Sequence, residues 1–123
     1  MAQSESLAGT RWRITAINNG KGAVASVVAG SAVTLAFGAD GKAGGSAGCN
    51  QYTAGYEAKG SKLQFRAPAA NRRMCADEGL MEQEHLFLKV LESVASVHVE
   101  GNRLELRNAQ GALLVRASQS SSG

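Results

Sequence analysis

Two cysteines are the residues of this sequence whose type most readily supports chemistry. Cys49 lies in a glycine-rich segment, GSAGCNQYTAGY, and Cys75 follows much later in the stretch NRRMC. The pair does not form a CxxC motif, which argues against a thioredoxin-type redox site and against a paired-cysteine zinc knuckle. A nucleophilic cysteine would need a nearby base and a group to orient it, and neither histidine lies in a motif that supplies them.

A metal site could be completed only by adding both histidines to the two cysteines. On a helical wheel with Leu80 at zero, His85 lies near 140°, away from the apolar stripe, at about 100° per residue. His98 falls on the outer face of its predicted strand. We therefore expect no metal site, no cofactor and no catalytic residue in this chain.

A disulfide between Cys49 and Cys75 is the interpretation that we favour over two free buried thiols. Such a bond would stabilise a small domain by roughly 3 kcal/mol in the chain-entropy model. It would also imply an oxidising compartment. The N-terminal residues, MAQSESLAGT, lack the charged and apolar regions of a signal peptide, so the chain is either cytosolic or a mature form that begins after such a signal.

Glu84 is an unexpected residue, because it interrupts the apolar stripe of a predicted helix. It lies near 40° on the same wheel, where a carboxylate is costly unless it is paired. We interpret it as a structural pin, since a catalytic acid or base would need a second convergent group that is not recognisable here. Its candidate partners are backbone amides of the glycine-rich bend or a guanidinium: Cys49, Asn50, Arg72 and Arg73.

The remaining pattern predicts an α+β fold. From Asp77 the apolar residues recur at helical spacing, which predicts one amphipathic helix of about four turns with a stripe of Leu80, Phe87, Leu91 and Val94. Pro68 is expected to close the strand region before it. We predict a curled, barrel-like antiparallel sheet with this helix packed on it. Short alternating or β-branched runs predict the strands: 11–16, 24–28, 32–37, 42–47, 56–58, 63–66, 96–100, 103–107 and 112–116.

Length and charge narrow the class of protein further. A chain of 123 residues forms one domain, which we place at 7–117 with flexible tails at 1–6 and 118–123. The net charge is +3, but the basic residues are scattered, which favours a mildly basic solvated surface over nucleic-acid binding. No apolar run approaches the roughly 20 residues of a transmembrane helix. No phosphate-binding or metalloprotease motif occurs.

Several short segments stand out together: Leu7–Trp12, Gly48–Asn50, Gly55–Tyr56, Arg73–Cys75, Met81–Glu84, Phe87–Leu88 and Leu91. In combination they resemble the motifs of the META domain family, also called the HslJ-like family. The resemblance covers nearly the whole chain, from about Leu7 to Val115. The chain departs from the family before Cys75, where members carry a threonine, and it lacks the residue between Met74 and Cys75. The family's structural positions correspond here to Trp12, Gly48, Cys49, Asn50, Gly55, Tyr56, Arg73, Cys75 and Glu84.

The resemblance implies a compact α+β domain of Gram-negative envelope proteins that are often exported or lipid-anchored. It implies a location in the periplasm or on the periplasmic face of the outer membrane rather than in the cytoplasm. Relatives act in heat shock, novobiocin resistance and trypanosomatid virulence, and the family has no established catalytic residue. The fold is similar to that of pilotin-type lipoproteins, which hold apolar peptide or lipid. The family also supports the disulfide and the structural role of Glu84.

We therefore expect a monomeric, non-enzymatic envelope domain that binds an apolar segment of another protein or a lipid-like ligand. Two alternatives stay open at this point. One is a small enzyme that uses Cys49 or Glu84, and the other is a purely structural stress-response module without a small ligand.

Overall fold

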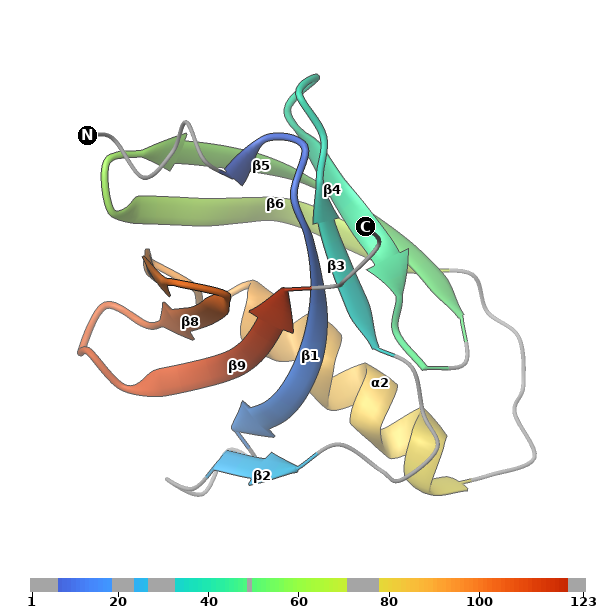
Figure 1. Ribbon diagram of the computed structural model, residues 1–123. Helices are drawn as coiled ribbons and strands as arrows, with labels where there is room; N and C mark the ends of the chain where they lie inside the picture. The colour runs from blue at the N-terminus through green and yellow to red at the C-terminus, as the bar shows by residue number, and fades with distance from the viewer. Residues whose placement is uncertain (1–6, 19–23, 27–32, 49, 71–77, 120–123) are drawn as a thin grey trace.

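The computed structural model describes residues 7–18, 24–26, 33–48, 50–70 and 78–119. Within these residues the chain forms nine β-strands and one longer α-helix, which lies between the sixth and seventh strands (Figure 1). In chain order the elements are β1 (Arg11–Asn18), β2 (Val24–Ser26), β3 (Thr34–Phe37), β4 (Lys42–Ser46), β5 (Gln51–Lys59), β6 (Lys62–Ala70), α2 (Glu78–Leu91), β7 (Ser96–Glu100), β8 (Arg103–Arg107) and β9 (Leu113–Gln119).

The strands form a closed antiparallel barrel with one strand added at its margin. From β3 to β9 each strand pairs with the next one in the chain, and β1 closes the ring by pairing with both β3 and β9. Arg13 of β1 thus lies between Thr34 of β3 and Ser118 of β9. The short strand β2 pairs with the second half of β1, opposite Ala16 to Asn18. The predicted barrel-like α+β fold is confirmed.

Three register shifts curve the sheet. They lie between Ile14 and Ala16, where β1 pairs with β9, between Thr53 and Gly55, where β5 pairs with β6, and between Leu106 and Arg107, where β8 pairs with β9. A shift of this kind bends its strand and increases the local twist, which helps a sheet of short strands to close.

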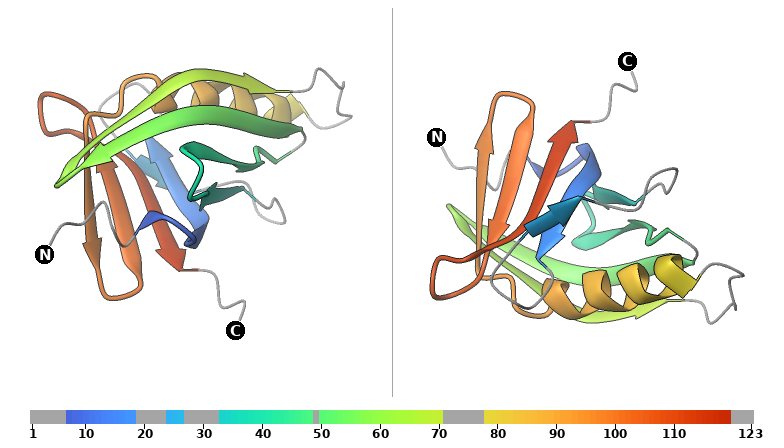
Figure 2. Two further views of the ribbon diagram at one scale, coloured as in Figure 1. Left: turned by 90° about the horizontal axis from the view of Figure 1, so that it is seen from above. Right: turned by 90° about the horizontal axis from the view of Figure 1, so that it is seen from below.

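The helix covers the place where the barrel is least completely paired. β6 and β7 share the single register pair Lys62 and Ser96, and beyond it β6 diverges from β7. Helix α2 packs against β6 and β1, and the view from below shows it lying across β5 and β6 (Figure 2). Phe87 and Leu91 point from the helix into the core, where both are fully buried. The predicted amphipathic helix is confirmed.

Buried side chains from every side of the barrel meet in one apolar core. The ring of Tyr52 on β5 packs edge-on against Phe87 of the helix, with ring centroids 5.3 Å apart. Phe37 packs in the same way against Tyr56, at 5.0 Å. The largest fully buried side chains are Leu7, Trp12, Ile14, Val33, Leu35, Phe37, Leu63, Phe87, Leu91, Leu104, Leu106 and Val115.

Two expectations about strand ends are wrong. Pro68 does not close the strand region, because β6 continues to Ala70. Pro68 lies next to the register shift between β5 and β6, where the ladder is interrupted and a missing N–H costs little. At the other end of the chain, Ser118 and Gln119 belong to β9 rather than to a tail, since they pair with Arg13 and Trp12 of β1.

The close pairing of β4 and β5 gives a sharp prediction for Gly44. A Cβ atom there would lie 2.6 Å from the backbone oxygen of Tyr52, so Gly44→Ala should lower the free energy of unfolding by about 1–3 kcal/mol through overpacking. The matched control is Gly55→Ala, because a Cβ at Gly55 meets nothing closer than 3.8 Å. The control should keep or raise stability by up to about 1 kcal/mol. Equal urea midpoints for the two variants would contradict this account of the sheet.

Candidate functional site

The glycine-rich segment begins at the end of β4 and continues into β5, and Ala47, Gly48 and Asn50 lie between the two strands. The N–H of Ala47 donates to the carbonyl of Asn50 at 2.8 Å, and Ala47 also forms a bridge to Val33. Gly48 has φ of 110°, a conformation that side-chain-bearing residues rarely adopt. The segment is therefore a tight turn that requires glycine at this position, and it presents Asn50 toward the helix.

Glu84 of α2 is held by Asn50 through two hydrogen bonds, an arrangement that we call the Glu84–Asn50 clasp. The backbone N–H of Asn50 donates to Oε1 of Glu84 at 2.8 Å, and its side-chain Nδ2 donates to Oε2 at 2.7 Å. Asn50 is only 4% exposed. Both carboxylate oxygens thus accept a hydrogen bond, which offsets much of the cost of placing the carboxylate among apolar residues.

The side chains around the clasp are also tied by hydrogen bonds. The hydroxyl of Tyr52 donates to the carbonyl of Thr34 at 2.6 Å, and the hydroxyl of Thr34 accepts from the N–H of Ser46 at 2.9 Å. Burial raises the pKa of Tyr52 far above its ordinary value of 10.0, so its hydroxyl stays protonated and continues to donate. These bonds join β3, β4 and β5 beside the helix and fix the direction from which Asn50 approaches Glu84.

The other residues singled out in the sequence lie apart from the clasp. Trp12 is buried and donates from Nε1 to the hydroxyl of Thr10 at 2.8 Å. Gly55 lies in β5 between Lys42 and Arg66. Tyr56 is half-buried and donates to the carbonyl of Gly38 at 2.6 Å. Its pKa is raised by burial and by the negative charge of Asp40.

Three of the predicted site residues lie outside the described part of the chain: Cys49, Arg73 and Cys75. The predicted disulfide therefore stays a prediction. The same holds for the alternative that the guanidinium of Arg72 or Arg73 is a partner of Glu84. His85 and His98 are both exposed, and Nε2 of His98 lies 3.4 Å from a carboxylate oxygen of Glu100. Among the described residues, no group of three or more His, Cys, Asp or Glu side chains could hold a metal ion.

A second feature of the structure is a cluster of arginines on the outside of the barrel, which the sequence analysis did not predict. Because β1 pairs with β9 and β9 pairs with β8, residues from both ends of the chain come together on one surface. The signal in the sequence was an arginine at outward-facing positions of these strands, but strand order was needed to see that they are neighbours. We call this surface the arginine face; it consists of Arg11, Arg13, Arg103, Arg107 and Arg116.

These features define a small antiparallel barrel in which the first and last strands pair and a single helix is pinned by a carboxylate. The sequence model of the META domain matches residues 5–121. The chain therefore belongs to the META domain family.

Solved structures share this fold. A protein from Burkholderia xenovorans, determined by NMR, superposes with a TM-score of 0.77 at 24% sequence identity, over 96% of this chain and 86% of that one. A second NMR structure gives 0.72 at 23% identity, over 96% and 95% of the two chains. A DUF4847 family protein from Bacteroides vulgatus gives 0.61 at 13% identity, over 98% and 99%. At these identities the likeness shows the fold alone.

The comparisons assign no activity to the chain. No curated protein matches its sequence. META domain proteins are generally associated with the cell envelope. In the described ranges, no helix has the length and apolar character needed to cross a membrane.

The clasp predicts different effects for two glutamates of the same helix. Glu84→Gln replaces one accepting oxygen with an NH₂ group that cannot accept from Asn50, so the free energy of unfolding should fall by about 1–3 kcal/mol. Glu82→Gln removes the same charge at an exposed position and should change it by less than about 0.5 kcal/mol. Urea unfolding at neutral pH measures both. A Glu84→Gln variant as stable as the Glu82→Gln variant would remove the structural role of the clasp.

Proposed function

We propose that this chain is a non-catalytic domain of the cell envelope that binds an apolar protein segment or a lipid-like ligand. The supporting observation is an apolar flank on α2 formed by Leu80, Met81 and Leu88. Met81 is 39% exposed and is the one exposed large hydrophobic side chain among the described residues. Leu80 and Leu88 beside it are half-buried. An alkyl chain or an apolar side chain could cover this flank and remove it from water.

The position of the flank fits a binding role better than a catalytic one. Glu84 lies between Leu80 and Leu88 on the helix surface, and both of its oxygens already accept hydrogen bonds from Asn50. A carboxylate held in this way orients the helix and is poorly placed to transfer protons to a substrate. The clasp thus keeps the flank rigid, which lowers the entropy cost of binding.

Four further parts of this proposal rest on the sequence and on the family resemblance. The protein would work in the periplasm or on the periplasmic face of the outer membrane, as a monomer whose fold is locked by a disulfide between Cys49 and Cys75. Its physiological role would lie in heat shock or in novobiocin resistance. The competing function is a purely structural stress-response module, which needs no ligand at the flank. A catalytic role for Cys49 or Glu84 is the other competitor.

Binding at the flank can be tested with dodecylphosphocholine, used below its micelle-forming concentration as an alkyl-chain probe. Titration should shift the amide NMR signals of Leu80, Met81 and Leu88 more than those of the barrel strands. Met81→Glu should weaken the apparent affinity about tenfold, because a charge at the contact opposes burial of the chain. The matched control, Gln110→Glu, adds the same charge at an exposed turn and should leave the affinity unchanged.

Either of two results would contradict the proposal. Unchanged signals at the flank, or equal probe affinity in the Met81→Glu and Gln110→Glu variants, would favour the structural module. Circular dichroism of both variants verifies that the fold is intact.

The disulfide has its own test, titration of free thiols in unfolded protein kept under non-reducing conditions. We expect no reactive thiol before reduction and two after it, one each from Cys49 and Cys75. Reduction should also lower stability, by roughly 3 kcal/mol in the chain-entropy model. Two reactive thiols before reduction would disprove the disulfide and make thiol chemistry at Cys49 the better explanation.

A further inference from the structure

We propose that the arginine face docks on an anionic phospholipid surface. The face lies on the outside of β1, β9 and β8, and it is separate from the apolar flank of the helix. Docking through this face therefore does not require a ligand at the flank.

Strand register brings the arginines within range of one another. Arg13 lies opposite Ser118, and Ser118 lies opposite Arg103, so the two arginines are two strands apart, or about 10 Å. In the neighbouring row Arg116 lies opposite Glu105. The Debye length at physiological ionic strength is about 8 Å, so repulsion between these guanidinium groups is largely screened, and the arginines can stand side by side on one surface. Together they form a net basic surface in which Glu105 is the acidic member.

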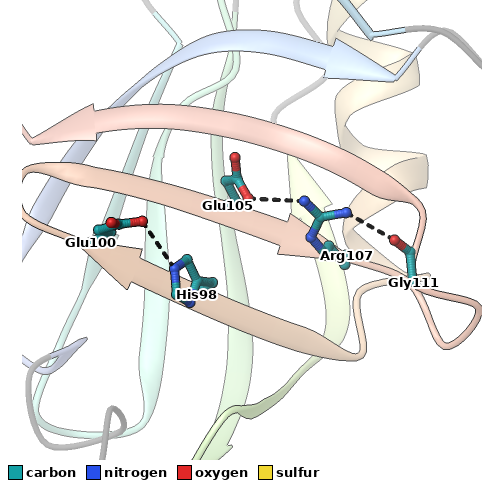
Figure 3. A network of polar contacts seen from close by, with 5 residues as sticks. All are labelled: His98, Glu100, Glu105, Arg107 and Gly111. Carbon is teal, nitrogen blue, oxygen red and sulfur yellow. Dashed lines mark hydrogen bonds and ion pairs between the residues drawn. The ribbon is translucent and has the colours of Figure 1, made fainter.

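Only part of the positive charge of the arginine face is paired with acidic groups in the described part of the chain. Arg107 donates to Glu105 at 3.0 Å and to the carbonyl of Gly111 at 2.9 Å, as Figure 3 shows. On the neighbouring strand β7, His98 and Glu100 interact with each other (Figure 3). The other four arginines are exposed and make no ion pair within the described part of the chain: Arg11, Arg13, Arg103 and Arg116. Their guanidinium groups stay available for an external anion.

The chemistry of the face fits a layer of phosphates. A guanidinium group can donate two parallel hydrogen bonds to one phosphate, which makes arginine well suited to phosphate recognition. No aromatic side chain of this protein is exposed, so the stacking platform typical of single-stranded nucleic-acid binding is missing from the described surface. The face consists of sheet, without a helix that could enter the groove of a duplex. A lipid surface requires only a broad array of cations, which this face provides.

Vesicle sedimentation with the full chain tests the proposal. The protein should bind vesicles of phosphatidylcholine mixed with phosphatidylglycerol, should not bind pure phosphatidylcholine, and should be released as salt rises to about 0.5 M. Because each basic residue near an anionic membrane contributes roughly a fivefold gain in binding, the triple substitution Arg13→Ser, Arg103→Ser and Arg116→Ser should reduce partitioning by at least about tenfold.

Two matched controls separate the face from net charge and from folding. The triple substitution Lys42→Ser, Lys59→Ser and Arg66→Ser removes the same charge from exposed positions on the other strands, and it should bind at least several-fold better than the face variant. Lysine at the three arginine positions of the face keeps the charge and should retain most of the binding. Melting curves verify that all three variants are folded.

Several results would overturn the proposal. They are equal losses in the two serine variants, binding to pure phosphatidylcholine, or no binding to either vesicle at low salt. A fourth is tighter binding to a short DNA duplex than to the anionic vesicles, with the same arginines required, because it would assign the face to nucleic acid.

Discussion

The pairing of the first strand with the last one is the constraint on which the rest of this structure depends. The hydroxyl of Thr15 donates to the carbonyl of Arg116 at 3.0 Å, across 101 positions of sequence. The same pairing brings Ile14 opposite Ala117, and both are buried. Without it the sheet would be open between β1 and β9, its core would face water there, and Arg13 would not lie near Arg103.

The Glu84–Asn50 clasp complements this closure, because it fixes helix α2 against the strands. The apolar stripe of α2 would bury itself in several rotations, since hydrophobic burial has no direction. Two short hydrogen bonds to a single residue of the β4–β5 turn select one of them. A carboxylate in an apolar stripe lowers stability, but its two hydrogen bonds give helix α2 one defined orientation.

Local patterns predicted the local parts of this fold. The alternation in β7 and β8 placed Val97, Leu104 and Leu106 inward, and all three are buried. The helical wheel singled out Glu84, and its observed partner, Asn50, is in the segment that the sequence indicated. Strand lengths were underestimated in β5 and β6, where a register shift interrupts the alternation. The arginine face was not predictable, because its members come from three strands whose adjacency depends on barrel closure and not on neighbouring residues.

The divergence of β6 from β7 has a consequence for association between copies of this protein. A closed barrel has no free strand edge, but β6 leaves its ladder to β7 after Lys62 and presents backbone groups on that side. Such an edge is a template for pairing with a strand of another molecule. Pro68 cannot donate to an incoming strand, and α2 packs against β6. The helix thus also shields this edge from fibre-like aggregation, and loosening it would expose a seam of the barrel where another chain could add.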